Sequence, residues 1–230
     1  MQIITQKQNN NMEAPAAAGA FPVWHNLAQI ARMPLVWLGL AVLAALGYGY
    51  AMAVPAVDMD DLALATYQQG GEFLRQGRFT VWLLQAATGI MRYQRFWPEL
   101  FFAVSLALAG LVLAAVWYAA KGEAPTAAGT LLLAGAMLLW PYHGEILMYS
   151  NQCGVGFGFL LCALALALAA PHILGGWRTG LPGALGAAVL LSAALGLYES
   201  FAPVWLTLVF ALLLLCAVQA APYTYKAGQY

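Results

Sequence analysis

The chain has 230 residues, of which 63% are hydrophobic and only 8% are charged. Soluble domains have about 25% charged residues, so this composition leaves too little polar surface for a water-soluble fold and indicates an integral membrane protein. The formal net charge is zero, which excludes nucleic-acid binding, because that function needs a basic surface to displace counterions from phosphates.

The first 33 residues are predicted to lie outside the membrane spans. The segment "KQNNNMEAPAAAG" is polar and rich in Pro, Ala and Gly, and it lacks the basic-then-apolar layout of a signal peptide. Residues 21–33 mix aromatic and apolar positions with His25 and Arg32, a pattern that indicates a short helix at the membrane surface. We therefore expect residues 1–33 to form a polar arm and an interfacial segment.

Six apolar runs are long enough to cross about 30 Å of hydrocarbon, which takes roughly 20 residues of helix. The runs are 34–54, 99–119, 126–142, 154–171, 181–198 and 201–220. They predict an all-α polytopic bundle with about six transmembrane helices over residues 34–220. Residues 55–98 form a long first loop, and 221–230 form a short C-terminal tail.

The acidic residues are distributed unevenly between the two sides of this predicted bundle. Lys and Arg divide almost evenly, so the positive-inside rule barely decides the orientation. Seven of the nine acids fall on the side of the first loop: Asp58, Asp60, Asp61, Glu72, Glu99, Glu145 and Glu199. We expect a multi-pass protein of the bacterial inner membrane whose N-terminus is cytoplasmic, so that these carboxylates face the periplasm.

The first loop has a helical pattern of its own. Residues 61–94 contain no proline, and their apolar residues recur at about helical spacing. This pattern predicts two amphipathic helices along the membrane surface, broken at Gly70 and Gly71.

Three carboxylates begin the first loop, at Asp58, Asp60 and Asp61. One of them suffices to cap the helix that begins near Leu62, where the helix dipole favours a negative charge. Clustered carboxylates also raise one another's pKa, and such groups are typical of proton-transfer sites. Asp60 and Asp61 are therefore the candidate general bases, and Asp58 is either a third member of the site or a cap.

Two arginines follow in the same loop. Arg75 and Arg78 lie three positions apart, which would place them on one helical face, and guanidinium groups bind phosphate oxygens in a bidentate way. The alternative is that their side chains reach lipid headgroups, which is the favoured interpretation for Arg92 and Arg95. Arg78 and Arg75 are the candidate phosphate-binding residues.

An Asp-Asp pair after the first membrane helix, then a surface helix and "QGRFTVWLLQ", resembles the O-antigen glucosyltransferase type of the GT-C membrane glycosyltransferases. "GLYESF", residues 196–201, is similar to a segment that recurs in that family at a helix turn. The resemblance implies a GT-C-like fold, a polyprenyl-phosphate sugar donor, and inverting transfer with a first-loop carboxylate as base. It matches Asp60 and Asp61 to the acidic pair and Arg78 to the Gly-Arg step. It implies no obligatory cofactor, although a divalent cation on Asp58 and Asp60 stays open.

The third loop, "WPYHGEILMYSNQ", combines aromatic and amide side chains. This composition is typical of sugar binding and equally of an aromatic belt at the headgroups. The candidate substrate-binding residues of the whole chain are Tyr67, His143, Glu145, Tyr149, Asn151, Gln152, Tyr198 and Glu199. His143 and Glu145 are only two ligands, and the cysteines (Cys153, Cys162 and Cys216) show no metal spacing and are interpreted as packing residues, so no metal site is predicted.

The leading hypothesis is a membrane enzyme that transfers a sugar, with glucose implied by the resemblance, from a polyprenyl-phosphate donor to a glycan or lipid acceptor. Two alternatives stay open. One is a non-catalytic membrane subunit, or a short half-enzyme that needs a partner subunit or an oligomer. The other is a transporter of small molecules or lipids, which is disfavoured because the helix interiors at 103–117, 127–139 and 157–168 contain no ionisable group.

Overall fold

The computed structural model describes residues 23–54, 72–89, 96–141, 143, 154–175 and 181–220. Every regular element in these residues is a helix. The helices are α1 (Val23–Ala31), α2 (Pro34–Ala53), α4 (Glu72–Arg75), α5 (Phe79–Thr88), α6 (Trp97–Lys121), α7 (Ala127–Leu138), α9 (Gly154–Gly175), α10 (Leu181–Leu195) and α11 (Phe201–Ala220). The prediction of an all-α polytopic bundle is confirmed.

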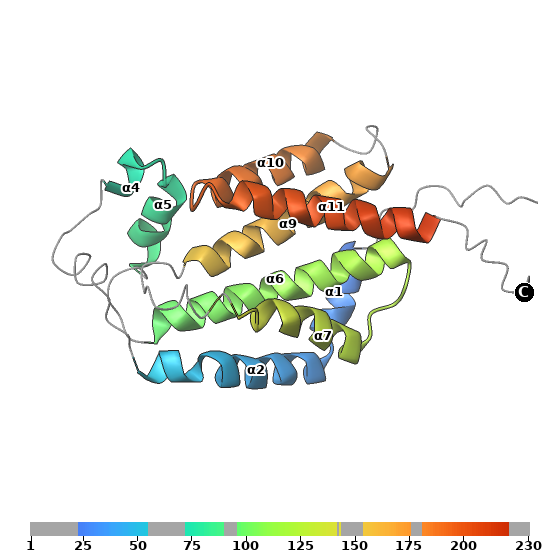
Figure 1. Cartoon of the computed structure of the whole chain (residues 1–230), viewed down its shortest axis with the longest axis horizontal. Coiled ribbons are helices and arrows are strands. Elements are labelled where there is room, and N and C mark those ends of the chain that lie inside the picture. Colours follow the sequence, from blue (N-terminus) through green and yellow to red (C-terminus); the bar gives the residue numbers. More distant parts are fainter. Residues whose placement is uncertain are drawn as a thin grey trace, which may run out of the picture.

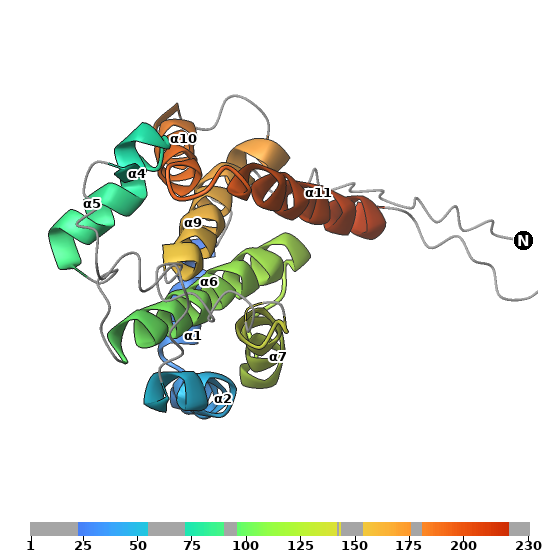
Figure 2. The same ribbon diagram turned by 60° about the vertical axis from the view of Figure 1, so that its left-hand side comes forward.

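Six of the helices lie side by side and alternate in direction: α2, α6, α7, α9, α10 and α11 (Figures 1 and 2). The centre consists of α6 and α9, in each of which 61% of the apolar span is buried, against 17% in α2 and 11% in α11. One end of the bundle, here called the first-loop end, is where α2, α7 and α10 finish and α6, α9 and α11 begin. The short helices α4 and α5 lie at that end (Figure 1).

All six predicted spans are helical, but they differ in length. Among the described residues, four helical segments are long and apolar enough to cross a membrane: Pro34–Ala53, Trp97–Lys121, Gly154–Ile173 and Phe201–Gln219. Helix α7 has 12 residues and α10 has 15, which correspond to about 18 Å and about 22 Å at 1.5 Å per residue. These two helices are shorter than the hydrocarbon thickness of about 30 Å.

The two short helices end before their predicted limits for local reasons. We expected the third span to reach residue 142, but α7 ends at Leu138. Pro141 disfavours the helical conformation in the residue before it and has no N–H to donate. Helix α10 ends at Leu195 and not at residue 198, because the chain tightens there into a turn in which the Leu197 N–H donates to the Ala194 carbonyl at 3.0 Å.

Small residues allow the central helices to approach closely. A Cβ atom on Gly110 of α6 would lie 2.7 Å from the Cα of Ala134 in α7. A Cβ on Gly156 of α9 would lie 2.7 Å from the carbonyl oxygen of Phe102 in α6. Close backbone packing is what associates helices in lipid, where apolar side chains gain little by leaving the hydrocarbon.

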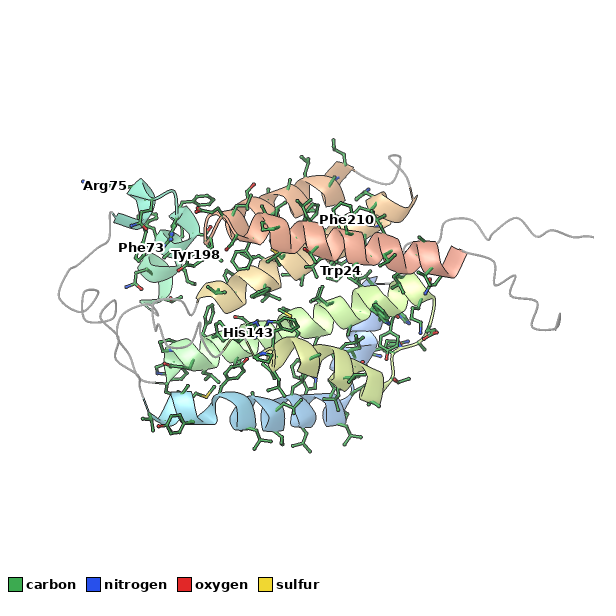
Figure 3. All side chains as sticks on the ribbon, in the orientation of Figure 1. Trp24, Phe73, Arg75, His143, Tyr198 and Phe210 are labelled. Carbon is green, nitrogen blue, oxygen red and sulfur yellow. The ribbon has the colours of Figure 1, made fainter. Side chains whose placement is uncertain are left out.

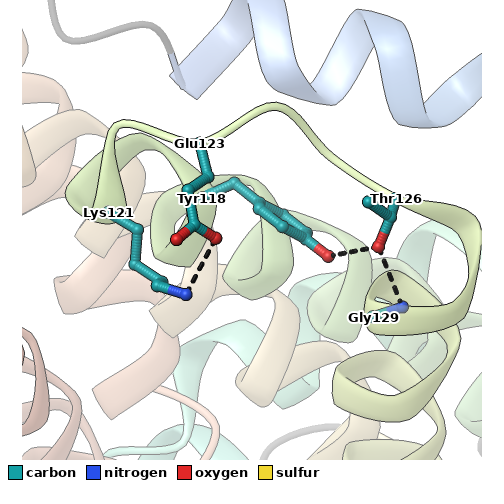
Figure 4. A network of polar contacts seen from close by, with 5 residues as sticks. All are labelled: Tyr118, Lys121, Glu123, Thr126 and Gly129. Carbon is teal, nitrogen blue, oxygen red and sulfur yellow. Dashed lines mark hydrogen bonds and ion pairs between the residues drawn. The ribbon is translucent and has the colours of Figure 1, made fainter.

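The opposite end of the bundle contains a polar network at the turn between α6 and α7 (Figure 4). The Thr126 Oγ1 accepts the Gly129 N–H at 3.2 Å and thereby caps the N-terminus of α7. The same oxygen lies 3.1 Å from the Tyr118 hydroxyl. Lys121 and Glu123 form an exposed ion pair at 2.8 Å, which contributes little to stability.

Thr126→Ala is expected to lower the free energy of unfolding by about 1 kcal/mol, because the first turn of α7 loses its capping oxygen. Thr126→Ser keeps the oxygen and is the matched control. Unfolding of both variants in mild detergent, followed by helical circular dichroism, measures the difference. Equal stability of the Ala and Ser variants would show that the cap is not stabilising.

Candidate functional site

The first loop and the turn between α10 and α11 are joined at the first-loop end. The Thr80 N–H donates to the Gly196 carbonyl at 3.1 Å. Two residues before Thr80, the guanidinium carbon of Arg78 lies 4.5 Å from the ring centroid of Tyr198. The structure therefore brings together "QGRF" and "GLYESF", two motifs that lie far apart in the sequence.

The position of Arg78 depends on a break between α4 and α5. Gly77 has a φ of +76°, a conformation that glycine adopts without steric cost. The Arg78 N–H then donates to the Phe73 carbonyl at 2.7 Å. We expected Arg75 and Arg78 to share one helical face, and this is wrong because α4 ends at Arg75 and α5 begins at Phe79.

The two candidate phosphate-binding arginines consequently differ in their surroundings. Arg75 is exposed and points away from the bundle (Figure 3). Arg78 is half-buried, and its guanidinium lies over the Tyr198 ring. Of the two, Arg78 is the one that is held at the first-loop end by both backbone and ring contacts.

Gly196 permits the close approach of the first loop. A Cβ atom at this position would lie 2.5 Å from the Phe79 ring and 2.6 Å from the Thr80 Oγ1. Both distances are shorter than any normal contact, so a side chain at residue 196 would force the two segments apart.

A cluster of aromatic rings, here called the aromatic cluster, supports the turn from inside the bundle. It contains Tyr48 of α2, Phe102 of α6, His143, Phe159 of α9 and Phe201 of α11. Neighbouring ring centroids lie between 5.4 and 6.0 Å apart in edge-to-face arrangements, a geometry that aromatic rings favour. Because Phe201 ends the "GLYESF" segment, the turn is anchored to the core of the bundle.

His143 is placed deep within this cluster, with only 2% of its surface exposed (Figure 3). The Tyr48 hydroxyl donates to the Leu138 carbonyl and also lies 3.5 Å from the Nδ1 atom of His143. Burial lowers the pKa of His143, despite an opposing effect of the Leu138 backbone. This shift favours the neutral form of the imidazole. The contact of His143 with substrate stays a prediction.

Comparison with known proteins assigns the chain to a family. Residues 49–222 match the family described as glucosyl transferase GtrII. The chain belongs to this family. No curated protein and no solved structure matches it.

The family match includes both motifs of the first-loop end, because residues 49–222 extend from the last turn of α2 to beyond α11. The protein is accordingly a membrane glycosyltransferase. Its substrates as classes are a sugar donor and a glycan acceptor. The predicted resemblance to the O-antigen glucosyltransferases of the GT-C type is confirmed at this level.

Many of the predicted site residues of this glucosyltransferase lie outside the described residues. They are Asp58, Asp60, Asp61, Tyr67, Glu145, Tyr149, Asn151 and Gln152. Their roles stay predictions. Glu199 is described and lies exposed in the turn beside Tyr198.

In the part of the chain that the structure describes, no three His, Cys, Asp or Glu side chains are grouped to hold a metal ion. The candidate cation ligands Asp58 and Asp60 are not in that part of the chain.

Glu99 is an acidic residue of the first-loop end that is not among the predicted site residues. Glu99 lies in the first turn of α6 and is only 8% exposed. A carboxylate is favoured in this position because the N-terminus of a helix is electropositive. In the sequence, Glu99 is the acid that begins the predicted apolar run 99–119, where it is counted among the acids on the side of the first loop.

Gly196→Ala is expected to destabilise the glucosyltransferase by about 1–3 kcal/mol, because the added methyl group overlaps Phe79 and Thr80. Gly49→Ala in α2 is the matched control, since a Cβ at that position meets no atom within 4 Å. Thermal unfolding in detergent compares the two variants. A Gly196→Ala protein as stable as Gly49→Ala would contradict the close docking of the first loop on the turn.

Proposed function

We propose that the protein transfers a glucosyl residue from a polyprenyl-phosphate donor to a glycan or lipid acceptor at the first-loop end of the bundle, with inversion at the anomeric carbon. The observation that supports this most is the contact of Arg78 with Tyr198 in a chain of the GtrII family. This contact places the Arg78 cation beside the segment "GLYESF", which also resembles the family. Both lie at the first-loop end, where the phosphate of a lipid-linked donor would lie.

The proposed reaction needs a base and an anion-binding group. One of the first-loop carboxylates, Asp60 or Asp61, takes the proton of the acceptor hydroxyl, a role that contributes about 10²- to 10⁴-fold in rate. The hydroxyl oxygen forms a bond to the anomeric carbon as the bond from that carbon to the phosphate oxygen breaks. The leaving polyprenyl phosphate gains negative charge, which the Arg78 guanidinium stabilises through charge-assisted hydrogen bonds.

An apolar groove on the surface of the bundle is consistent in its chemistry with a lipid-linked donor. It has a volume of about 310 Å³ and lies between α6, α7 and α11, with a small contribution from α9. Its lining is almost entirely apolar and includes Leu113, Trp117, Met137, Trp140, Leu208 and Leu212. We assign part of the isoprenoid chain of the donor to this groove, because a polyprenyl tail has no polar group to satisfy.

The proposed location is the bacterial inner membrane, with a cytoplasmic N-terminus and the first-loop end on the periplasmic side. Support comes from the alternating helices, which gather the ends of three acid-bearing connections at the first-loop end. On this orientation, the sugar is transferred outside the cytoplasm.

The proposal is tested with Asp60→Asn and Asp61→Asn, made singly and together, in the full chain reconstituted in liposomes. Transfer of radiolabelled glucose from polyprenyl-phosphate glucose to lipopolysaccharide is the measurement. The variant that removes the base is expected to lose about 10²- to 10⁴-fold in turnover, since the acceptor hydroxyl keeps its proton.

Glu123→Gln is the control for this experiment, because Glu123 is an exposed carboxylate at the opposite end of the bundle. It should transfer glucose like the unmodified protein. If the Asp60→Asn, Asp61→Asn double variant also transfers glucose at the full rate while inserted and folded, the assigned base is wrong.

A further inference from the structure

We propose that Tyr198 is a positioning residue for donor binding: its aromatic ring holds the Arg78 guanidinium in place for the phosphate of the lipid-linked donor. This inference rests on the proposed function, because it concerns the same phosphate. It adds a role for the ring of Tyr198, on a segment distant from Arg78 in the sequence.

The first step of the argument is the nature of the contact. The guanidinium carbon of Arg78 lies 4.5 Å from the ring centroid of Tyr198, over the ring. Attraction between a cation and the negative face of an aromatic ring uses no hydrogen bond. The N–H donors of the guanidinium are therefore still available for the oxygens of an anion.

The second step is that the backbones of both partners are fixed relative to each other. Thr80, two residues after Arg78, donates its N–H to the carbonyl of Gly196, two residues before Tyr198, at 3.1 Å. The contact between Phe79 and Gly196 leaves no room for a side chain at 196. The contact of Arg78 with Tyr198 is thus part of a packed junction that is held by a backbone hydrogen bond and a close contact.

The third step is that the ring side of the junction is rigid. Phe201, which is 2% exposed, is packed edge-on against Phe159 at 5.4 Å. Its N–H donates to the carbonyl of Tyr198 at 3.1 Å. The backbone of Tyr198 is therefore tied to the aromatic cluster, and its side chain is packed against the buried core, so the ring supports the guanidinium from a held position.

The fourth step concerns charge. Among the described residues, no carboxylate forms an ion pair with Arg78. An aromatic ring attracts the guanidinium without neutralising its charge. A half-buried cation held in this way keeps its full charge for an anionic ligand, whereas a carboxylate partner would compete with the phosphate.

The test is a double-mutant cycle on the full chain in liposomes, with Tyr198→Leu, Arg78→Gln and the two combined. The measured quantities are kcat and the KM for polyprenyl-phosphate glucose at saturating lipopolysaccharide. Tyr198→Leu is expected to raise the donor KM about three- to thirtyfold with a smaller change in kcat. In the Arg78→Gln background the same change should have less than about a twofold effect, because the ring has no cation left to hold.

Two further variants separate positioning from general packing. Tyr198→Phe keeps the aromatic face and should restore most of the donor affinity that Tyr198→Leu loses. Tyr50→Leu is the matched control, since Tyr50 is 79% exposed on α2 near the same end of the bundle, and it should leave the donor KM unchanged.

If Tyr198→Leu is not recovered in folded form, fluorinated phenylalanines at position 198 replace it. Fluorine weakens the negative face of the ring in steps while the shape is nearly kept, so the donor KM should rise with each added fluorine. A donor KM that does not change along this series would overturn the positioning role.

The outcomes distinguish this inference from the function on which it rests. If Arg78→Gln leaves the donor KM unchanged, Arg78 does not bind the donor phosphate and both proposals fail at that residue. If Arg78→Gln raises the donor KM but Tyr198→Leu acts equally in both backgrounds, the phosphate assignment stands and the positioning role of Tyr198 is wrong.

Discussion

The hydrogen bond from the Thr80 N–H to the Gly196 carbonyl is the constraint on which the first-loop end depends. The spanning helices are apolar all round, so they are specified by length and packing and provide few polar contacts. At this junction a backbone donor of the first loop meets a backbone acceptor of a distant turn, with glycine at the point of contact. Arg78 and Tyr198 are each two residues away and are placed by it.

The aromatic cluster connects that junction to the rest of the bundle. Phe201 follows the turn directly and is packed against Phe159, which in turn contacts His143. Through His143 and Tyr48 the cluster also reaches α2 and the end of α7. Helices α2, α6, α9 and α11, the end of α7 and the connection that contains His143 thereby converge beside the first-loop end. This packing supports the junction rigidly. Rigid support of this kind is what precise placement of charged groups requires.

The sequence predicted the class of the protein and its helices well, because hydropathy over 20 residues reports the membrane directly. It did not predict that α7 and α10 would be short. Helix α7 ends inside an apolar run, because Pro141 disfavours the helical conformation in the residue before it. A hydropathy pattern does not reveal a helix end whose flanking residues are also apolar. The break at Gly77 was also missed, because the apolar spacing on both sides of it is helical.

The candidate site was predicted in parts. The motifs containing Arg78 and Tyr198 were both chosen for their resemblance to the family, but no pattern in the sequence pairs residues so far apart. His143 was chosen for the aromatic and amide composition of its loop, which does not distinguish a ring at the surface from a ring in the core. Glu99 was counted only among the acids on the side of the first loop, since the sequence does not show that this carboxylate is buried.

The central claim is that the junction of the first loop with the α10–α11 turn forms the binding site for the donor phosphate. A cryo-electron microscopy structure of the full chain in a lipid nanodisc with bound polyprenyl phosphate tests it most directly. The account predicts density for the phosphate within hydrogen-bonding distance of the Arg78 guanidinium, with the Tyr198 ring on its other face. Phosphate density separated from Arg78 by the width of a helix would contradict the account.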